Sequence, residues 1–133
     1  MARSETRTLT NADPDFYPLM GPYLSNRAVV KSLGGPVWDD PGKTWIVLLA
    51  SGQVTGFIAV TDHGHIESLY TAPGHHDLRT ALVKAAVEQA GDRPLTAVVS
   101  HSRAGHYKAA GFAETRHTVN FTTLHRPSRE TAS

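Results

Sequence analysis

Short apolar runs and one long segment of helical spacing dominate the middle of the chain. The runs at 44–50, 54–61 and 66–72 are rich in β-branched and aromatic residues, which predicts buried strands. Ser51-Gly52 separates the first two, and a turn at 62–65 separates the second from the third. Connections this short join antiparallel neighbours, so we expect an antiparallel run.

The segment that follows the third run predicts a helix. Pro73-Gly74 breaks the strand, and Asp77 suits the N-cap of a helix that extends to Gly91. The helix then begins where the strand ends. Its free backbone N–H groups and the positive end of its dipole predict an anion site at that point.

Other signals complete the order of elements. A short edge strand is expected at 6–10, a short helix capped by Asp13, and a second helix capped by Ser25. The apolar run at 95–100 predicts a strand, and Ser102 is expected to cap a short helix after it. Partial alternation over 113–125 predicts a final strand or a bent pair of strands.

Together these elements predict the α/β class, with a mixed sheet and helices on both faces. Because a helical crossover joins 66–72 to 95–100, we expect these two strands to be parallel. The chain has 133 residues, which suits one domain, expected over 1–126. The polar segment 127–133 is expected to be a flexible tail.

The composition limits the partners and the cellular location that we expect. The net charge is +1, which provides no general electrostatic footprint for a nucleic-acid partner. The chain contains no cysteine, and we find neither a signal peptide nor an apolar stretch of membrane-spanning length. We therefore expect a cytoplasmic protein with no membrane partner.

Three pieces of the chain resemble the GCN5-related N-acetyltransferase (GNAT) family. The segment 54–60, with Gly56 inside it, is similar to the family's third strand, and 66–73 is similar to its fourth. The segment 107–112, which begins at Tyr107 and ends in Gly111-Phe112, matches the family's Tyr-x-x-x-Gly-Phe signature. The resemblance implies a GNAT fold with a parallel pair of fourth and fifth strands, and acyl transfer from acetyl-CoA, the co-substrate, to an amine.

The loop expected to bind the pyrophosphate departs from the family pattern, Arg/Gln-x-x-Gly-x-Gly/Ala. Residues 75–81 read His-His-Asp-Leu-Arg-Thr-Ala and lack both glycines, which normally let backbone N–H groups approach a phosphate. Arg79 could supply a side-chain contact instead. The resemblance places the coenzyme along the fourth strand and this loop, and the residues implied are Leu69, Tyr70, Thr71, Asp77, Arg79, Thr80 and Ala81.

Two residues are candidates for the chemistry. The resemblance gives Tyr107 the role of general acid toward the leaving thiolate, and the alternative is an aromatic ring that only packs. Glu67 lies on the central strand, where several relatives place a general base. The alternatives are an ordered water chain, a histidine base at His101 or His106, or a carboxylate on a solvent face.

The N-terminal helices and the loop after them form the acceptor side in this fold. The aromatic and polar residues there that could contact an acceptor are Tyr23, Asn26, Arg27, Trp38 and Trp45. A tryptophan such as Trp38, beside two aspartates, either fills the core or stacks on a ligand. The eight histidines show no spacing typical of a metal site, and we expect no metal.

The acceptor itself is not readable from the sequence, and it can be a small molecule or a macromolecule. One alternative keeps the fold and modifies adenine in DNA, as GNAT-like phage proteins of the Mom type do. The altered loop fits such a divergent member, whereas the near-neutral charge argues against it. A second alternative is a non-catalytic binding module, and a homodimer is also possible.

Overall fold

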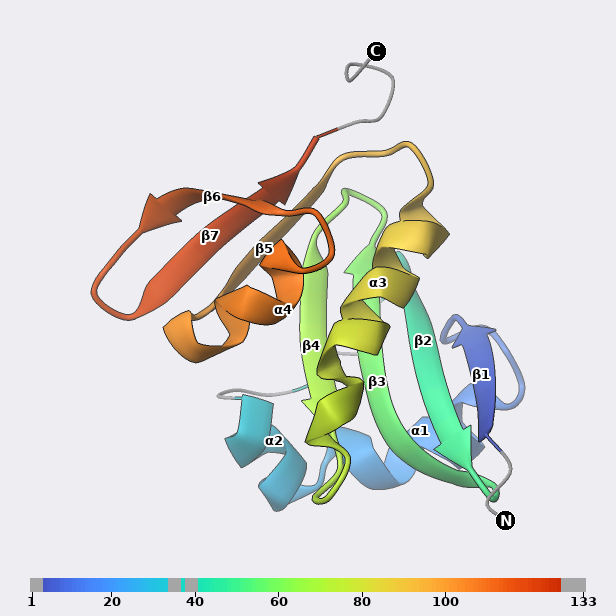
Figure 1. The fold of residues 1–133 in the computed structure, drawn as a ribbon. Coiled ribbons are helices and arrows are strands. Elements are labelled where there is room, and N and C mark those ends of the chain that lie inside the picture. The colour runs from blue at the N-terminus through green and yellow to red at the C-terminus, as the bar shows by residue number, and fades with distance from the viewer. Residues whose placement is uncertain (1–3, 34–36, 38–40, 128–133) are drawn as a thin grey trace.

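The computed structural model describes residues 4–33, 37 and 41–127. Figure 1 shows the path of the chain. Within the described residues the elements follow in this order: β1 (Ser4–Leu9), α1 (Phe16–Leu24), α2 (Arg27–Leu33), β2 (Lys43–Ala50), β3 (Gln53–Thr61), β4 (Ile66–Thr71), the 3₁₀ helix η1 (His76–Leu78), α3 (Arg79–Ala90), β5 (Leu95–Ser100), the 3₁₀ helix η2 (His101–Arg103), α4 (Ala104–Lys108), β6 (Ala113–His117) and β7 (Phe121–Arg126).

The first sheet has the order β1-β2-β3-β4, and each neighbouring pair is antiparallel, as the short turns predict. Ser51 and Gly52 form the β2–β3 turn with φ angles of 52° and 81°. Two successive positive φ angles match the right-handed twist of the flanking strands. The second sheet has the order β5-β7-β6 and is also antiparallel, so the bent pair of strands predicted over 113–125 is confirmed.

The expected parallel pairing of β4 with β5 is not confirmed along the length of the strands. It is reduced to one parallel bridge between His65 and Thr96, supported by the bond from the Thr96 N–H to the Gly64 carbonyl at 2.8 Å. Beyond that bridge the strands diverge (Figure 1). Ser68 has a φ of 58° and puts one extra residue into β4 opposite β3, and such a bulge bends a strand and increases its twist.

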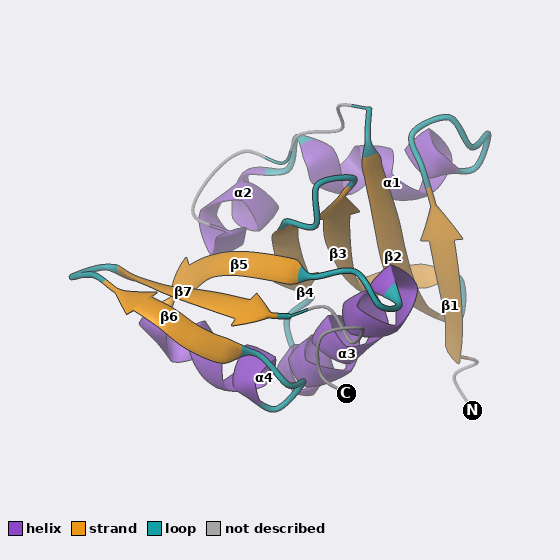
Figure 2. Ribbon diagram, turned by 90° about the horizontal axis from the view of Figure 1, so that it is seen from above, coloured by secondary structure: helices purple, strands orange, loops and turns teal. Residues whose placement is uncertain are grey.

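The predicted helices on both faces are confirmed. In Figure 2, α3 and α4 lie on one side of the sheets, and α1 and α2 lie on the other. One hydrophobic cluster fills the α3/α4 side and includes Leu82, Leu95 and Leu124, and a second fills the α1/α2 side around Phe16 and Trp45. No helix in the described part of the chain is both long and apolar enough to cross a membrane.

Three helix starts differ from the sequence prediction for local reasons. The first helix begins at Phe16, because the Asp13 carboxylate accepts from the Thr10 N–H at 2.7 Å and closes a turn instead. The second begins after Asn26, not Ser25, since Asn26 Oδ1 accepts from the N–H of Ala28 at 2.9 Å. In the short helix after β5, the predicted capping residue lies inside η2.

The central helix also begins later than Asp77. The Leu78 N–H bonds the His75 carbonyl at 3.0 Å, and the Arg79 N–H bonds the His76 carbonyl, which makes a 3₁₀ turn before α3. Asp77 lies inside this turn and makes no capping bond to α3. The N–H of Arg79, the first residue of α3, is therefore already used, so less of the predicted anion site comes from the backbone.

Gly56 allows α3 to pack closely on the first sheet. A Cβ at this position would lie 2.9 Å from Leu82 Cδ1 and 2.9 Å from the Tyr70 carbonyl oxygen. The carbonyl belongs to the neighbouring strand and cannot move aside without disturbing the β3–β4 pairing. We expect Gly56→Ala to lower the free energy of unfolding by about 1–3 kcal/mol, as overpacking does, measured by urea denaturation.

Gly105 is the matched control for this substitution. It lies exposed inside α4, and a Cβ there would meet nothing within 4 Å outside its chain neighbours. Gly105→Ala should therefore raise stability by about 0.5–1 kcal/mol, because alanine loses less backbone entropy in a helix. Equal effects of the two substitutions would contradict the proposed role of Gly56.

Candidate active site

An arginine that the sequence did not point to connects the segment after β5 to β4. Arg103 follows β5 in η2, and its Nη1 donates a hydrogen bond to the Leu69 carbonyl of β4 at 2.7 Å. Leu69 comes directly after the bulged residue Ser68, where the edge of β4 turns away from β5. The only sequence signal for Arg103 is its position four residues before Tyr107.

Basic groups gather at the start of α3. Arg79 is half-buried, and its Nε atom is buried with no hydrogen-bond partner in the part of the chain that the structure describes. The next residue, Thr80, hydrogen-bonds through Oγ1 to Nδ1 of His106 in α4 at 2.9 Å. Burial lowers the pKa of Arg103, and the positive charge of Arg79 lowers it further.

The environment of His106 is also cationic. Burial lowers the pKa of His106, and the nearby charges of Arg79 and then Arg103 lower it further. Neighbouring like charges disfavour one another's charged forms, so these groups are close enough to repel. Such a cluster is suited to a multiply charged anion, which would remove the repulsion.

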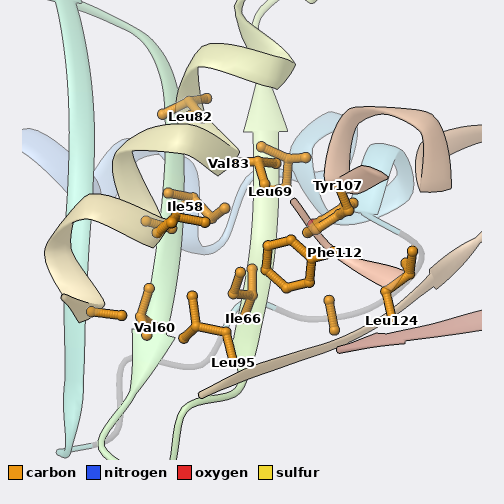
Figure 3. Packing of buried hydrophobic residues seen from close by; sticks show 14 of the residues in the cluster. Ile58, Val60, Ile66, Leu69, Leu82, Val83, Leu95, Tyr107, Phe112 and Leu124 are labelled. Atoms are coloured by element: carbon orange, nitrogen blue, oxygen red, sulfur yellow. The ribbon is translucent and has the colours of Figure 1, made fainter. Parts of the chain in front are cut away.

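Tyr107 lies next to this cluster but inside the core. Its side chain is 2% exposed and packs edge-on against Phe112, with ring centroids 5.5 Å apart. Figure 3 shows both rings among the buried residues between β4, α4 and the second sheet. Burial raises the pKa of the Tyr107 phenol to about 12, although the charge of Arg103 acts in the opposite direction. The phenol is therefore protonated at neutral pH, as a general acid must be.

Glu67 lies on the other side of the first sheet. It pairs with Ala59, whose side chain belongs to the cluster under α1 and α2. Its carboxylate forms an ion pair of 2.8 Å with Lys43 Nζ, and its side chain is 44% exposed whereas that of Lys43 is 4% exposed. Lys43 was not singled out in the sequence, where its only signal is a lone lysine at the start of an apolar strand.

The remaining predicted coenzyme residues fall into two groups. Tyr70 and Thr71 are buried, and Thr71 Oγ1 hydrogen-bonds His76 Nδ1 at 2.8 Å. Burial raises the pKa of Tyr70. By contrast, Asp77 and Ala81 are exposed at the start of the helical segment. The structure thus brings Leu69, Arg79 and Thr80 into the neighbourhood of Arg103 and His106, and leaves Asp77 and Ala81 at the surface.

The predicted acceptor residues serve different purposes in the fold. Tyr23 packs against Tyr70 on the α1/α2 side, with ring centroids 6.2 Å apart. Asn26 caps α2 through its side-chain oxygen, and Arg27 is exposed at the start of that helix. Trp45 is fully buried, so it is a core residue and cannot contact an acceptor directly. Trp38 lies outside the described residues.

Of the two histidines considered as a base, His101 is already engaged in the fold. Both ring nitrogens of His101 are in use, with Nδ1 bonded to Thr122 Oγ1 at 2.8 Å and Nε2 bonded to the Val119 carbonyl at 3.0 Å. The ring of His101 also stacks on His117, with centroids 4.1 Å apart. Among the described residues, no group of three or more histidine, cysteine or acidic side chains could hold a metal ion.

The chain as a whole is similar to known acetyltransferases. The model of the Acetyltransferase (GNAT) family matches residues 9–117. An acyl-CoA N-acyltransferase from Pseudomonas aeruginosa has a similar structure, with a TM-score of 0.71 and 15% identity, over 92% of this chain and 99% of that one. No curated protein sequence gives a significant match.

Two further solved structures have the same fold. The N-acetyltransferase PseH of Campylobacter jejuni, in complex with acetyl coenzyme A, matches with a TM-score of 0.61 and 15% identity, over 94% of this chain and 99% of that one. A chimera of the spermidine N-acetyltransferase SpeG from Vibrio cholerae and hSSAT matches with a TM-score of 0.67 and 12% identity, over 97% of this chain and 98% of that one. At these identities the likeness shows the fold alone.

Proposed function

This chain belongs to the GNAT family of acetyltransferases, and we propose that it moves an acetyl group from acetyl-CoA to an amine bound on the α1/α2 side of β4. The observation that carries the proposal is the divergence of β4 from β5 beside a cluster of basic side chains. The diverging strands leave backbone groups of β4 beyond the His65–Thr96 bridge for an extended ligand. The basic cluster suits the phosphates of coenzyme A.

The donor side is assigned to Arg79 and to the β4 backbone. Without glycines in the loop, and with the Arg79 N–H bonded into η1, the phosphates need side-chain donors. Arg79 fits because its buried Nε lacks a hydrogen-bond partner within the described residues. The backbone of Leu69, Tyr70 and Thr71 would bind the pantetheine arm, and Arg103 would release the Leu69 carbonyl for it.

For the reaction, Tyr107 would donate its proton to the leaving thiolate, and Glu67 or a water molecule held by it would take the proton of the amine. The two groups lie on opposite sides of the first sheet, at its β4 edge. Donor and acceptor could therefore approach the edge from opposite sides. Lys43 would hold the Glu67 carboxylate in position through their ion pair.

On the acceptor side, we assign contacts to Tyr23, Asn26 and Arg27, which lie on α1 and at the start of α2. A panel of small amines, a peptide mixture and double-stranded DNA, each incubated with acetyl-CoA and followed by mass spectrometry for an added acetyl group, would identify the acceptor. We expect an amine to react. Modification of the DNA alone would contradict this and favour the adenine-modifying alternative.

Donor binding can be measured without knowing the acceptor. Titration of acetyl-CoA should release or absorb heat and raise the melting temperature by mass action. Arg79→Ala should weaken the binding about 10- to 100-fold, because a hydrogen bond to a charged group contributes about 1.5–3 kcal/mol.

Arg116→Ala is the matched control, since it removes the same charge from an exposed position on β6. It should leave the donor affinity unchanged apart from a small electrostatic effect. Absence of both heat and a thermal shift at millimolar acetyl-CoA would contradict the proposal. It would favour a binding module or a different donor.

A further inference from the structure

His106 of α4 lies in the basic cluster and connects α4 to the start of α3. Nδ1 of its ring is fixed by Thr80 Oγ1 at 2.9 Å, and within the described residues Nε2 has no hydrogen-bond partner. The charged groups that act on it are Arg79 at the start of α3 and Arg103 in η2. Lys108, on the same helix as His106, forms an ion pair with Glu114 instead, with 3.6 Å between Nζ and Oε2.

Acidic groups do not offset these cations in the described surroundings of His106. Asp77, the carboxylate in η1 just before α3, is exposed, and among the described residues no ion pair or hydrogen bond joins a carboxylate to His106. The ring is only partly exposed. In the absence of an anion, a proton on His106 is therefore opposed both by burial and by two guanidinium groups.

We propose that His106 is a further basic ligand for the phosphates of the donor and that it takes up a proton when they bind. The inference rests on the proposed function, because it assumes that a phosphate-bearing donor occupies this cluster. Nε2–H of the protonated ring would donate to a phosphate oxygen while Nδ1–H donates to Thr80 Oγ1. A hydroxyl can donate or accept a hydrogen bond, so Thr80 Oγ1 can remain bonded to Nδ1 in both the neutral and the protonated ring.

The sign of the pH effect follows from this arrangement. Without the donor, burial and the two arginines hold the pKa of His106 below its usual value of 6.5. The negative charge of the phosphates would raise that pKa, since an opposite charge favours the protonated form. Binding is then tighter at low pH, weakens as the pH rises between the two pKa values, and is constant above both.

Dephospho-coenzyme A is the appropriate probe. The 3′-phosphate of coenzyme A titrates near pH ~6, like other phosphate monoesters, and would obscure the effect, whereas the remaining pyrophosphate keeps its charge. Affinity should be measured by calorimetry from pH 5.5 to 8, in buffers of different ionisation enthalpy that report proton uptake. We expect the wild-type affinity to rise about tenfold toward low pH, equivalent to one unit of pKa change, with net proton uptake.

Variants distinguish the contribution of His106 to the pH dependence from that of other histidines near the loop, such as His76. His106→Gln should bind the probe with a much smaller pH dependence and less proton uptake. His106→Lys, which carries a charge throughout this range, should keep tight binding at pH 8. His63→Gln, in the exposed β3–β4 turn, should behave as the wild type.

Proton uptake that is unchanged in His106→Gln would overturn the inference, as would an affinity of the wild type that does not depend on pH. In both cases the donor site would remain, and the proposed function with it. Absence of binding at every pH, together with no binding of acetyl-CoA, would overturn both.

Discussion

Replacing Tyr107 by phenylalanine should lower turnover by about 10²- to 10⁴-fold, the usual contribution of general acid catalysis. The substitution removes one hydroxyl and keeps the ring that packs on Phe112 at 5.5 Å. Donor affinity should hardly change, because the hydroxyl would act on the leaving thiolate and not on the bound ground state. Steady-state kinetics with the reacting acceptor, together with acetyl-CoA calorimetry, would measure both effects.

A packing role for Tyr107 makes the opposite prediction. A Phe variant that works at the full rate would remove Tyr107 from the mechanism. Tyr107→Ala should in either case destabilise the protein by about 3–5 kcal/mol, because the side chain is buried. The Phe variant is therefore informative only if its urea unfolding curve stays close to that of the wild type.

The pH dependence offers a second test of the same residue. A general acid acts in its protonated form, so its contribution is lost as the pH rises through its pKa. Burial raises the pKa of Tyr107 to about 12, which moves that loss well above the range expected for an exposed phenol. We expect no alkaline decline in kcat attributable to Tyr107 below about pH 10.

A large effect on stability, comparable to that of Tyr107→Ala, is expected at Trp45. Its side chain is fully buried and contacts Phe16 of α1 and Phe57 of β3, with ring centroids 5.6 and 5.8 Å away. Trp45→Ala should lower the free energy of unfolding by about 3–5 kcal/mol through the lost contacts and the cavity left behind. Urea denaturation followed by circular dichroism would measure the change.

Trp45→Phe should be much milder. The indole Nε1 is buried without a hydrogen-bond partner in the described part of the chain, and an unmet buried donor costs about 1–3 kcal/mol. Phenylalanine removes that cost while it keeps most of the aromatic contact. Val119→Ala, at a side chain that is 92% exposed, should change stability by less than about 0.5 kcal/mol. Equal losses for Trp45→Phe and Trp45→Ala would contradict this account.

Local patterns were sufficient for most elements of the fold. The apolar runs became β2, β3, β4 and β5, and Ser51-Gly52 became the hairpin turn. Gly91 ended the central helix with a φ of 63°. These features depend on neighbours within a few residues, through turn geometry and the periods of strand and helix. The motif around Tyr107 likewise indicated the family that the match over 9–117 establishes.

Capping and pairing were less predictable, because several local choices compete. Asp13 and Ser25 were acceptable caps, but Asn26 caps the second helix, and Asp15 holds the N-cap position of the first without a capping hydrogen bond. Glu67 was recognisable as an isolated carboxylate on a strand. Its partner Lys43 lies 24 positions earlier and became visible only when β2, β3 and β4 were aligned.

The site itself was decided by tertiary structure. Arg79 was expected at the phosphate site, whereas Arg103 and His106 reach it from η2 and α4, which follow β5 in the chain. Leu69 and Arg103 lie 34 positions apart in the sequence, and no local pattern predicts their hydrogen bond. It forms because the bulge at Ser68 bends β4 away from β5, and α4 then packs against the start of α3. Divergence of two strands depends on contacts distant in the sequence, which hydrophobic periodicity does not encode.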